Sequence, residues 1–367
     1  MWRRRWLAEL AALSALAAAV SAASAQEVGT PATFEGGAKI SFSVEAARAH
    51  PRIIFDSGQS NDFMEPWDSV LFNGVSPDAG VVFELSRRDA SGRWSAWSAA
   101  AVRRFPGGRF WGRAKFALAP GPLRLRAVDK SASAANAVSV FSVEVFDSTE
   151  DAGKEEAGGH FSVGGGTRPL SHGRQEWKAK PPKSPYISDA PYLVTIHHTA
   201  GLRTKTLEES LAEVRFIQDF HQNGRGWSDI AYHFLIDAQG NIFEGRPEAV
   251  VGSHVRLHNE GNVGIALLGD YHPPKNDQPT PEQAAAVVAL GRYLVARYDV
   301  KVGTETVRGH RDYNSATSCP GDIVYALLGE LRSRFGEPAP APAPAIAARL
   351  DARLRRELES PNWDGRP

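Results

Sequence analysis

The stretch VTIHHTAG, residues 194–201, decides how the second half of the chain folds. The apolar and β-branched residues before the two histidines are typical of a buried strand, which we expect over Leu193 to His197. Further strands are predicted over Tyr232 to Asp237, Asn241 to Glu244 and Val263 to Leu268. These strands alternate with helical segments, so the sequence predicts an α+β domain in which helices cover a mixed central β-sheet.

Three helices are predicted between and after these strands. Thr206 has Glu209 three residues later, which is a capping-box spacing, and Gly224 offers a place for that helix to end. Thr280 is followed by Pro281, a residue favoured in the first turn, and so predicts a second helix. A third is expected from about 322 to 334.

The chain outside this domain divides by composition. Residues 31–146 contain short alternating runs, such as 80–86, 122–128 and 137–146, between clusters of turn residues, and we expect an all-β sandwich there. Residues 147–168 are acidic and glycine-rich, as in flexible linkers. The α+β domain then occupies 169–336, and 337–367 is predicted to be a Pro/Ala spacer with a short helix.

Residues 1–25 have the pattern of a secretory signal peptide. Three arginines at 3–5 precede an apolar run from Leu10 to Val20, and Ala23-Ser24-Ala25 forms a small-residue cleavage site. A membrane-spanning helix needs about 20 apolar residues, and this run is shorter. We therefore expect a secreted or periplasmic protein without a membrane span.

Composition excludes some partners. The 42 basic and 42 acidic residues balance, so there is no excess positive charge to attract nucleic acid or an anionic membrane surface. The chain has one cysteine, Cys319, which cannot form an internal disulfide and is therefore an inert, reactive or metal-bound thiol. We expect a monomer.

Histidines concentrate in the predicted α+β domain, where eight of the eleven lie from His197 to His310. His197 and His198 end a strand, and His310 and Cys319 lie in the loop before the last helix. Two imidazoles and one thiolate would leave the fourth position of a tetrahedral zinc ion open, as in catalytic zinc sites. Residue types alone leave three interpretations open, which are a zinc site, a structural cluster and a thiol nucleophile.

Several motifs in order carry a family resemblance. They are VTIHHTAG (194–201), GWSDIAYHFLID (226–237), GNIFEGRP (240–247), VGSH (251–254), NVGIALLGDY (262–271) and RGHRDYNSATSCPGD (308–322), preceded by RQEWKAKPP (174–182). This segment resembles the zinc-dependent N-acetylmuramoyl-L-alanine amidases of the peptidoglycan recognition protein type. Members of that family cleave the amide between the lactyl group of N-acetylmuramic acid and L-alanine, so the resemblance implies peptidoglycan or muropeptides as partners.

The resemblance also implies roles for single residues. The zinc ligands fall on His197, His310 and Cys319, the active-site tyrosine falls on Tyr232, and a position beside the transition state falls on Thr317. Zn²⁺ would supply a nucleophilic hydroxide. Tyr232 would orient the water or the carbonyl, and Thr317 would donate one hydrogen bond to the oxyanion.

Three further residues are candidate substrate contacts, and each has a structural alternative. They are His198, Trp227 and His254. In the β domain, Trp94 and Trp97 are three positions apart, so on one strand they would face opposite sides and one ring could stack on a sugar; packing is the alternative. Two rival functions also stay open, a non-catalytic peptidoglycan receptor and a metal-free cysteine hydrolase that uses Cys319 and His310.

Overall fold

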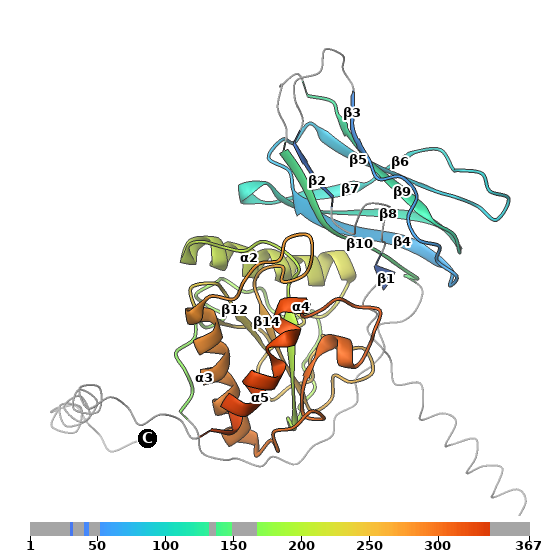
Figure 1. Ribbon diagram of the computed structural model, residues 1–367. Coiled ribbons are helices and arrows are strands. Elements are labelled where there is room, and N and C mark those ends of the chain that lie inside the picture. The colour runs from blue at the N-terminus through green and yellow to red at the C-terminus, as the bar shows by residue number, and fades with distance from the viewer. Residues whose placement is uncertain (1–29, 32–39, 44–51, 132–136, 149–166, 338–367) are drawn as a thin grey trace, which may run out of the picture.

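The computed structural model describes residues 30–31, 40–43, 52–131, 137–148 and 167–337. The strands of the first four ranges form the β region and the last range forms the α+β region, which lie against each other in Figure 1. The predicted signal peptide, most of the predicted linker and the C-terminal spacer lie outside the described residues. In the described part of the chain no helix is both long and apolar enough to cross a membrane.

Two antiparallel sheets make up the β region. The first has the order β1-β10-β4-β8-β7, with β2 also paired to β10, and the second has the order β3-β9-β5-β6. The strands are β1 Thr30–Pro31, β2 Ile40–Ser43, β3 Arg52–Asp56, β4 Trp67–Val75, β5 Val81–Arg87, β6 Ser98–Ala99, β7 Ala101–Arg104, β8 Arg109–Ala119, β9 Leu123–Asp129 and β10 Ala137–Phe146; a short 3-10 turn, η1, covers Pro106–Gly108.

Aromatic side chains from both sheets share one core. Phe72 of β4 and Phe110 of β8 come from the first sheet, and Phe83 of β5 comes from the second. The Phe83 and Phe110 rings stack at a centroid distance of 4.6 Å, and Phe72 meets Phe83 edge-on at 5.3 Å. Two sheets with their apolar faces together are the packing that a β-sandwich requires.

A five-stranded sheet is the centre of the α+β region, in the order β13-β12-β14-β11-β15. The strands are β11 Leu193–His198, β12 Phe234–Ile236, β13 Ile242–Glu244, β14 Asn262–Leu267 and β15 Val307–Gly309. β11 is parallel to β14 and β15, β12 is parallel to β14, and β12 pairs antiparallel with β13, so the predicted mixed sheet is confirmed. The predicted start of one strand is wrong, because Tyr232 lies in the loop that leads into β12.

The helices begin where the capping residues predict. The hydroxyl oxygens of Thr206 and Thr280 accept hydrogen bonds from the backbone at the start of α2 and α3, respectively. The helical elements are α2 Leu207–Asp219, a π-helical turn η2 Phe220–Arg225, α3 Pro281–Tyr298, a 3-10 turn η3 His310–Asp312, α4 Asp322–Ala326 and α5 Leu328–Gly336. The π-helical turn η2 continues α2 past Gly224 as far as Arg225, and Gly226, whose φ of 85° suits glycine, caps it. The predicted third helix is two helices, α4 and α5.

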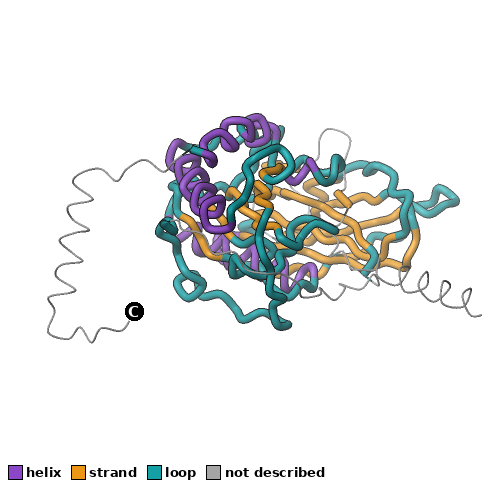
Figure 2. Tube along the Cα trace, turned by 90° about the horizontal axis from the view of Figure 1, so that it is seen from below, coloured by secondary structure: helices purple, strands orange, loops and turns teal. Residues whose placement is uncertain are grey.

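The central sheet has a helix layer on each face. Alternate residues of β12 point to opposite sides, so Phe234 and Ile236 pack with α3 and α5, whereas Leu235 packs with α2. Figure 1 shows α2 between the central sheet and the β region, and Figure 2 shows helices on both sides of the strands. The other side of α2 contacts the β region, where the ring of Phe216 from α2 meets the ring of Phe105 edge-on at a centroid distance of 5.1 Å.

Candidate metal centre

Three buried side chains converge at one edge of the central sheet. His197 lies at the carboxyl end of β11, His310 follows directly after β15, and Cys319 precedes α4. Because β11 and β15 are parallel, their carboxyl ends meet at the same edge, which is where sites in such sheets form. The sheet therefore brings together three residues that span more than a hundred positions.

The three side chains lie close together, and the distance between two of them fits a tetrahedral zinc ion. One ligand atom from each of His197, His310 and Cys319 lies within 4.8 Å of the others. The His197 Nδ1 to Cys319 Sγ distance is 3.5 Å. Zinc bonds of about 2.0–2.1 Å to nitrogen and about 2.3 Å to sulfur at a tetrahedral angle place these two atoms about 3.6 Å apart. Two imidazoles and a thiol are therefore ligand types that zinc prefers, and His197 and Cys319 have the spacing of two zinc ligands.

His254 holds the His197 ring in the orientation that a metal ligand needs. His254 Nε2 lies 2.8 Å from the Asn262 carbonyl oxygen, which can only accept, so Nε2 carries the proton. His254 Nδ1 then accepts from His197 Nε2 at 3.0 Å. This hydrogen-bond network assigns the free lone pair of His197 to Nδ1, the atom facing Cys319. The sequence did not reveal this role, because nothing local in VGSH indicates which histidine it contacts.

The two imidazoles are neutral at physiological pH. Burial lowers the pKa of His310 to about 4, and burial followed by the neighbouring His310 lowers that of His197 well below its ordinary value. Neutral imidazole is the form that binds a metal. Burial raises the pKa of the Cys319 thiol to about 12, and the backbone N–H of His198, 3.4 Å from Sγ, opposes that shift.

Tyr232 lies beside this cluster, with its ring centroid 5.2 Å from that of His197. The half-buried side chain lines the same cleft as His310 and Cys319. Burial raises the pKa of the hydroxyl above its ordinary value, so it is protonated at neutral pH and can donate a hydrogen bond.

Thr317 also lines the cleft. Its hydroxyl oxygen accepts from the backbone N–H of Cys319 at 3.2 Å, which leaves the hydroxyl hydrogen able to donate toward the cleft. Its position beside Cys319 is compatible with the role that the resemblance implies.

The three candidate substrate contacts are all buried cleft residues with structural partners. The His198 Nδ1 accepts from the Tyr271 N–H at 3.3 Å. The Trp227 ring packs on His221 at a centroid distance of 5.0 Å, and His254 contacts His197 as described. Each side chain therefore supports the site in addition to lining the cleft.

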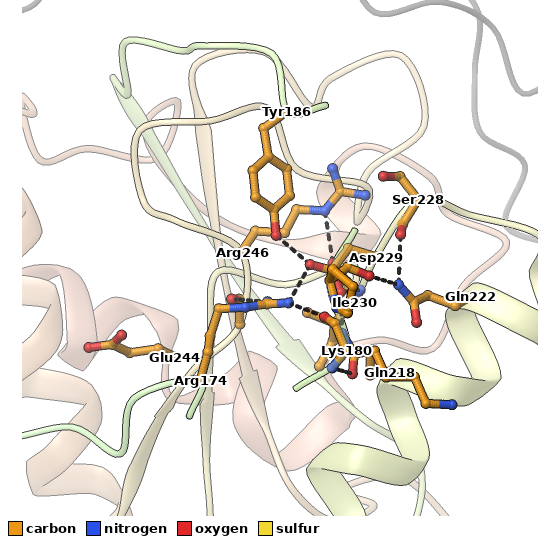
Figure 3. A network of polar contacts seen from close by, with 12 residues as sticks. Arg174, Lys180, Tyr186, Gln218, Gln222, Ser228, Asp229, Ile230, Glu244 and Arg246 are labelled. Carbon is orange, nitrogen blue, oxygen red and sulfur yellow. Dashed lines mark hydrogen bonds and ion pairs between the residues drawn. The ribbon is translucent and has the colours of Figure 1, made fainter. Parts of the chain in front are cut away.

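A polar network fixes the loop that leads to Tyr232 (Figure 3). The Asp229 carboxylate accepts from Tyr186 at 2.5 Å and from Gln218 at 2.6 Å, pairs with Arg174 at 2.7 Å, and also accepts from the backbone N–H of the next residue. Because Asp229 is fully buried, these four contacts replace the water that its charge has lost. No local pattern in the sequence indicates this network, because its members come from distant segments.

The cleft over the metal centre has a volume of about 680 Å³ and walls from both regions of the chain. The α+β region contributes His310, Cys319, Tyr232, His254 and Thr317, among others. The β region contributes Asn73, Arg109 and residues 141–144 of β10. The sequence predicted a separate β-sandwich and indicated none of its residues at this site.

The second cluster that the sequence indicated is built differently. The Arg124 guanidinium lies over both Trp94 and Trp97, at 4.2 and 5.0 Å from the ring centroids, and Arg126 lies over Trp97 at 4.2 Å. Arg126 also pairs with Glu84 at 2.5 Å. The expectation that the two rings face opposite sides is wrong, because both precede β6 and both contact Arg124. We call this stack the Trp–Arg ladder.

Comparisons with known proteins identify the α+β region. A family profile described as N-acetylmuramoyl-L-alanine amidase matches residues 188–322. Peptidoglycan-recognition protein SC2 of Drosophila simulans is 35% identical over 154 residues, which are 41% of this chain and 80% of that protein. Peptidoglycan recognition protein 1 of Mus musculus is 32% identical over 157 residues, covering 42% and 84%, respectively.

Among solved structures, this chain is similar to the N-acetylmuramoyl-L-alanine amidase LysC from Clostridium intestinale, with 30% sequence identity and a TM-score of 0.36. The match covers 43% of this chain and 95% of that protein. The sequence relatives are matched over most of their own length. The chain therefore belongs to the peptidoglycan recognition protein family and carries an N-acetylmuramoyl-L-alanine amidase domain at residues 188–322.

Proposed function

We propose that this protein is a zinc hydrolase that cleaves the amide between the lactyl group of N-acetylmuramic acid and L-alanine in peptidoglycan. The family contains both amidases and proteins that only bind, so the choice between them depends on the site. One observation supports catalysis most strongly. A buried ligand set of two imidazoles and a thiol lies within 4.8 Å, with a tyrosine beside it in the cleft.

The chemistry requires a nucleophile, a proton route and stabilisation of charge on the carbonyl oxygen. His197 Nδ1, one nitrogen of His310 and Cys319 Sγ would hold zinc, which when bound lowers the pKa of water from about 15.7 to about 7. Tyr232 presents a protonated hydroxyl that orients the water or the substrate carbonyl. Thr317 donates a hydrogen bond toward the oxyanion, without the charge that a lysine would bring.

The site also bears on the two rival functions. A receptor needs a cleft but does not need three converging ligand atoms with an oriented imidazole behind them. A cysteine hydrolase needs an accessible thiolate, whereas Cys319 is buried against two neutral imidazoles. Both arguments favour the zinc amidase.

Digestion of purified peptidoglycan separates these functions. The protein saturated with zinc is incubated with peptidoglycan, and newly freed L-alanine amino termini and the protein that sediments with the polymer are measured together. The amidase releases amino termini and loses this activity in a chelator. Sedimentation without release would instead identify a receptor, and release that persists at full rate in the chelator would identify a cysteine hydrolase.

Location agrees with this substrate. Peptidoglycan lies outside the cytoplasm, and we propose that residues 1–25 direct export to the secreted or periplasmic space. A monomer in solution is proposed as the working form.

A further inference from the structure

We infer that Glu144, on β10 of the β region, is a positioning residue for Tyr232, so that the β region is part of the catalytic unit. This inference rests on the proposed function, in which Tyr232 contacts the reacting groups. It goes beyond the family resemblance, since Glu144 lies outside the matched residues 188–322.

The first contact joins the two regions through a buried ion pair. Arg225, the last residue of η2, places Nη2 at 2.6 and 2.8 Å from the two carboxylate oxygens of Glu144. The exposed fractions of the two side chains are 8% and 11%, so little water screens this pair. Both residues line the cleft that contains Tyr232.

The second step leads from Arg225 to the histidine behind the tyrosine. The guanidinium lies 4.9 Å from the Trp227 ring centroid and 5.2 Å from that of Phe220. Trp227 in turn packs on His221 and donates its backbone N–H to the His221 carbonyl at 3.0 Å. The ion pair therefore fixes Arg225 over the two aromatic rings that flank His221.

The third step reaches the tyrosine. His221 Nδ1 accepts a hydrogen bond from the backbone N–H of Ala231 at 3.1 Å, directly before Tyr232 in the chain. The His221 and Tyr232 rings also meet nearly edge-on at a centroid distance of 5.8 Å. Glu144 acts on Tyr232 through Arg225, Trp227 and His221, and a displacement of about 1 Å at a reacting group can cost about 100-fold in rate.

The loop thus has two supports. The Asp229 network holds its middle from within the α+β region (Figure 3), and the contacts from Glu144 hold its beginning from the β region. Other contacts also join the regions, including the buried Arg109–Glu213 pair at 2.7 Å. Glu144 differs from that pair because its contacts continue to the residue before Tyr232.

Glu144→Gln tests the inference, because it keeps the shape of the side chain and removes its charge. The expected result is a fall in kcat of about tenfold or more with KM and zinc content unchanged, together with about tenfold faster hydrogen exchange of the Ala231 amide. The matched control is Glu84→Gln, which breaks the Arg126 pair inside the β region. This control should change neither kcat nor the hydrogen exchange of the Ala231 amide.

A second variant separates positioning from simple loss of stability. The double variant Glu144→Gln, Arg225→Gln leaves no unpaired buried charge, so thermal stability should recover relative to Glu144→Gln. Turnover should stay low, since the guanidinium over Trp227 is gone. Recovery of turnover together with stability would overturn the inference, as would a Glu144→Gln protein with the kcat and Ala231 exchange of the control.

These outcomes are distinct from failure of the proposed function. A wild-type protein that frees no L-alanine termini when loaded with zinc refutes the amidase and, with it, the catalytic meaning of Glu144. A wild-type protein that is active while Glu144→Gln is equally active refutes the positioning role alone.

Discussion

The metal centre and the Trp–Arg ladder both concentrate residues that can bind ligands, but their side chains point differently. In the ladder, Arg124 and Arg126 cover the rings of Trp94 and Trp97, so the groups that could bind a sugar contact one another. In the metal centre, His197, His310 and Cys319 present three ligand atoms to a common point.

The difference teaches how to separate a site from a structural cluster. Neighbouring groups in the metal centre bond the ligand residues. His254 bonds His197 Nε2, and the backbone N–H of His198 contacts Cys319 Sγ. Among the described residues, no group of His, Cys, Asp or Glu side chains that could hold a metal ion lies at the two ladder tryptophans. We therefore propose that the metal centre carries the activity and that the ladder stabilises the β region.

Removal of the thiol should have the largest effect. Cys319→Ser replaces the soft sulfur ligand with a weakly coordinating hydroxyl, so the protein should lose stoichiometric zinc and about 10³-fold or more of its activity. Metal analysis after gel filtration and the amino-terminus assay measure both quantities. A serine variant with full turnover would show that the cluster is not the catalytic centre.

Tyr232→Phe should follow in size. The variant keeps the ring against His197 and removes the hydroxyl, so kcat should fall about 100-fold while zinc binding stays unchanged. Steady-state kinetics with a soluble muropeptide gives kcat and KM separately. Unchanged turnover would remove Tyr232 from the mechanism and leave the metal centre intact.

His254→Ala should act on the metal rather than on the chemistry. Without the His254 imidazole, His197 Nε2 loses its hydrogen-bond acceptor and the His197 ring is no longer held in one orientation. The zinc affinity should therefore fall about 10-fold to 100-fold. Competition with a chromophoric chelator measures that affinity without substrate. His233→Ala is a suitable control, since His233 is also a buried histidine next to His254, but its two ring nitrogens bond the Val250 carbonyl oxygen and the Gly264 N–H. The zinc affinity of this control should be that of the wild type.

Trp97→Ala should have the smallest effect on activity and a measurable effect on stability. The substitution removes the ring that contacts both Arg124 and Arg126, which should lower the free energy of unfolding by about 1–2 kcal/mol. Turnover and binding to peptidoglycan should be unchanged. Weaker binding to the polymer at equal turnover would show instead that the ladder is a glycan site.

The sequence predicted the parts of the molecule that depend on local patterns. Capping residues located the starts of α2 and α3, and alternating runs indicated the strands. The ligand set was reached through the family resemblance, because residues as far apart as His197 and Cys319 have no local relation that fixes their distance.

Contacts between distant segments could not be predicted in the same way. Glu144 and Arg225 are 81 positions apart and belong to regions with different patterns, so neither sequence context indicates the other. The Trp94 and Trp97 expectation failed for a related reason. It assumed one continuous strand, whereas β6 begins only at Ser98, Trp94 forms an isolated bridge with Arg88, and both rings contact Arg124.

Titration of the metal-depleted protein with zinc tests the proposed amidase most directly. Chelator-treated protein receives increasing zinc, and the rate of release of L-alanine amino termini from peptidoglycan is followed together with bound metal. The rate should rise in proportion to bound zinc and reach its plateau at one ion per chain, with no rise for Cys319→Ser. Full activity in the metal-depleted protein, or no release at saturating zinc, would contradict the assignment of a zinc amidase.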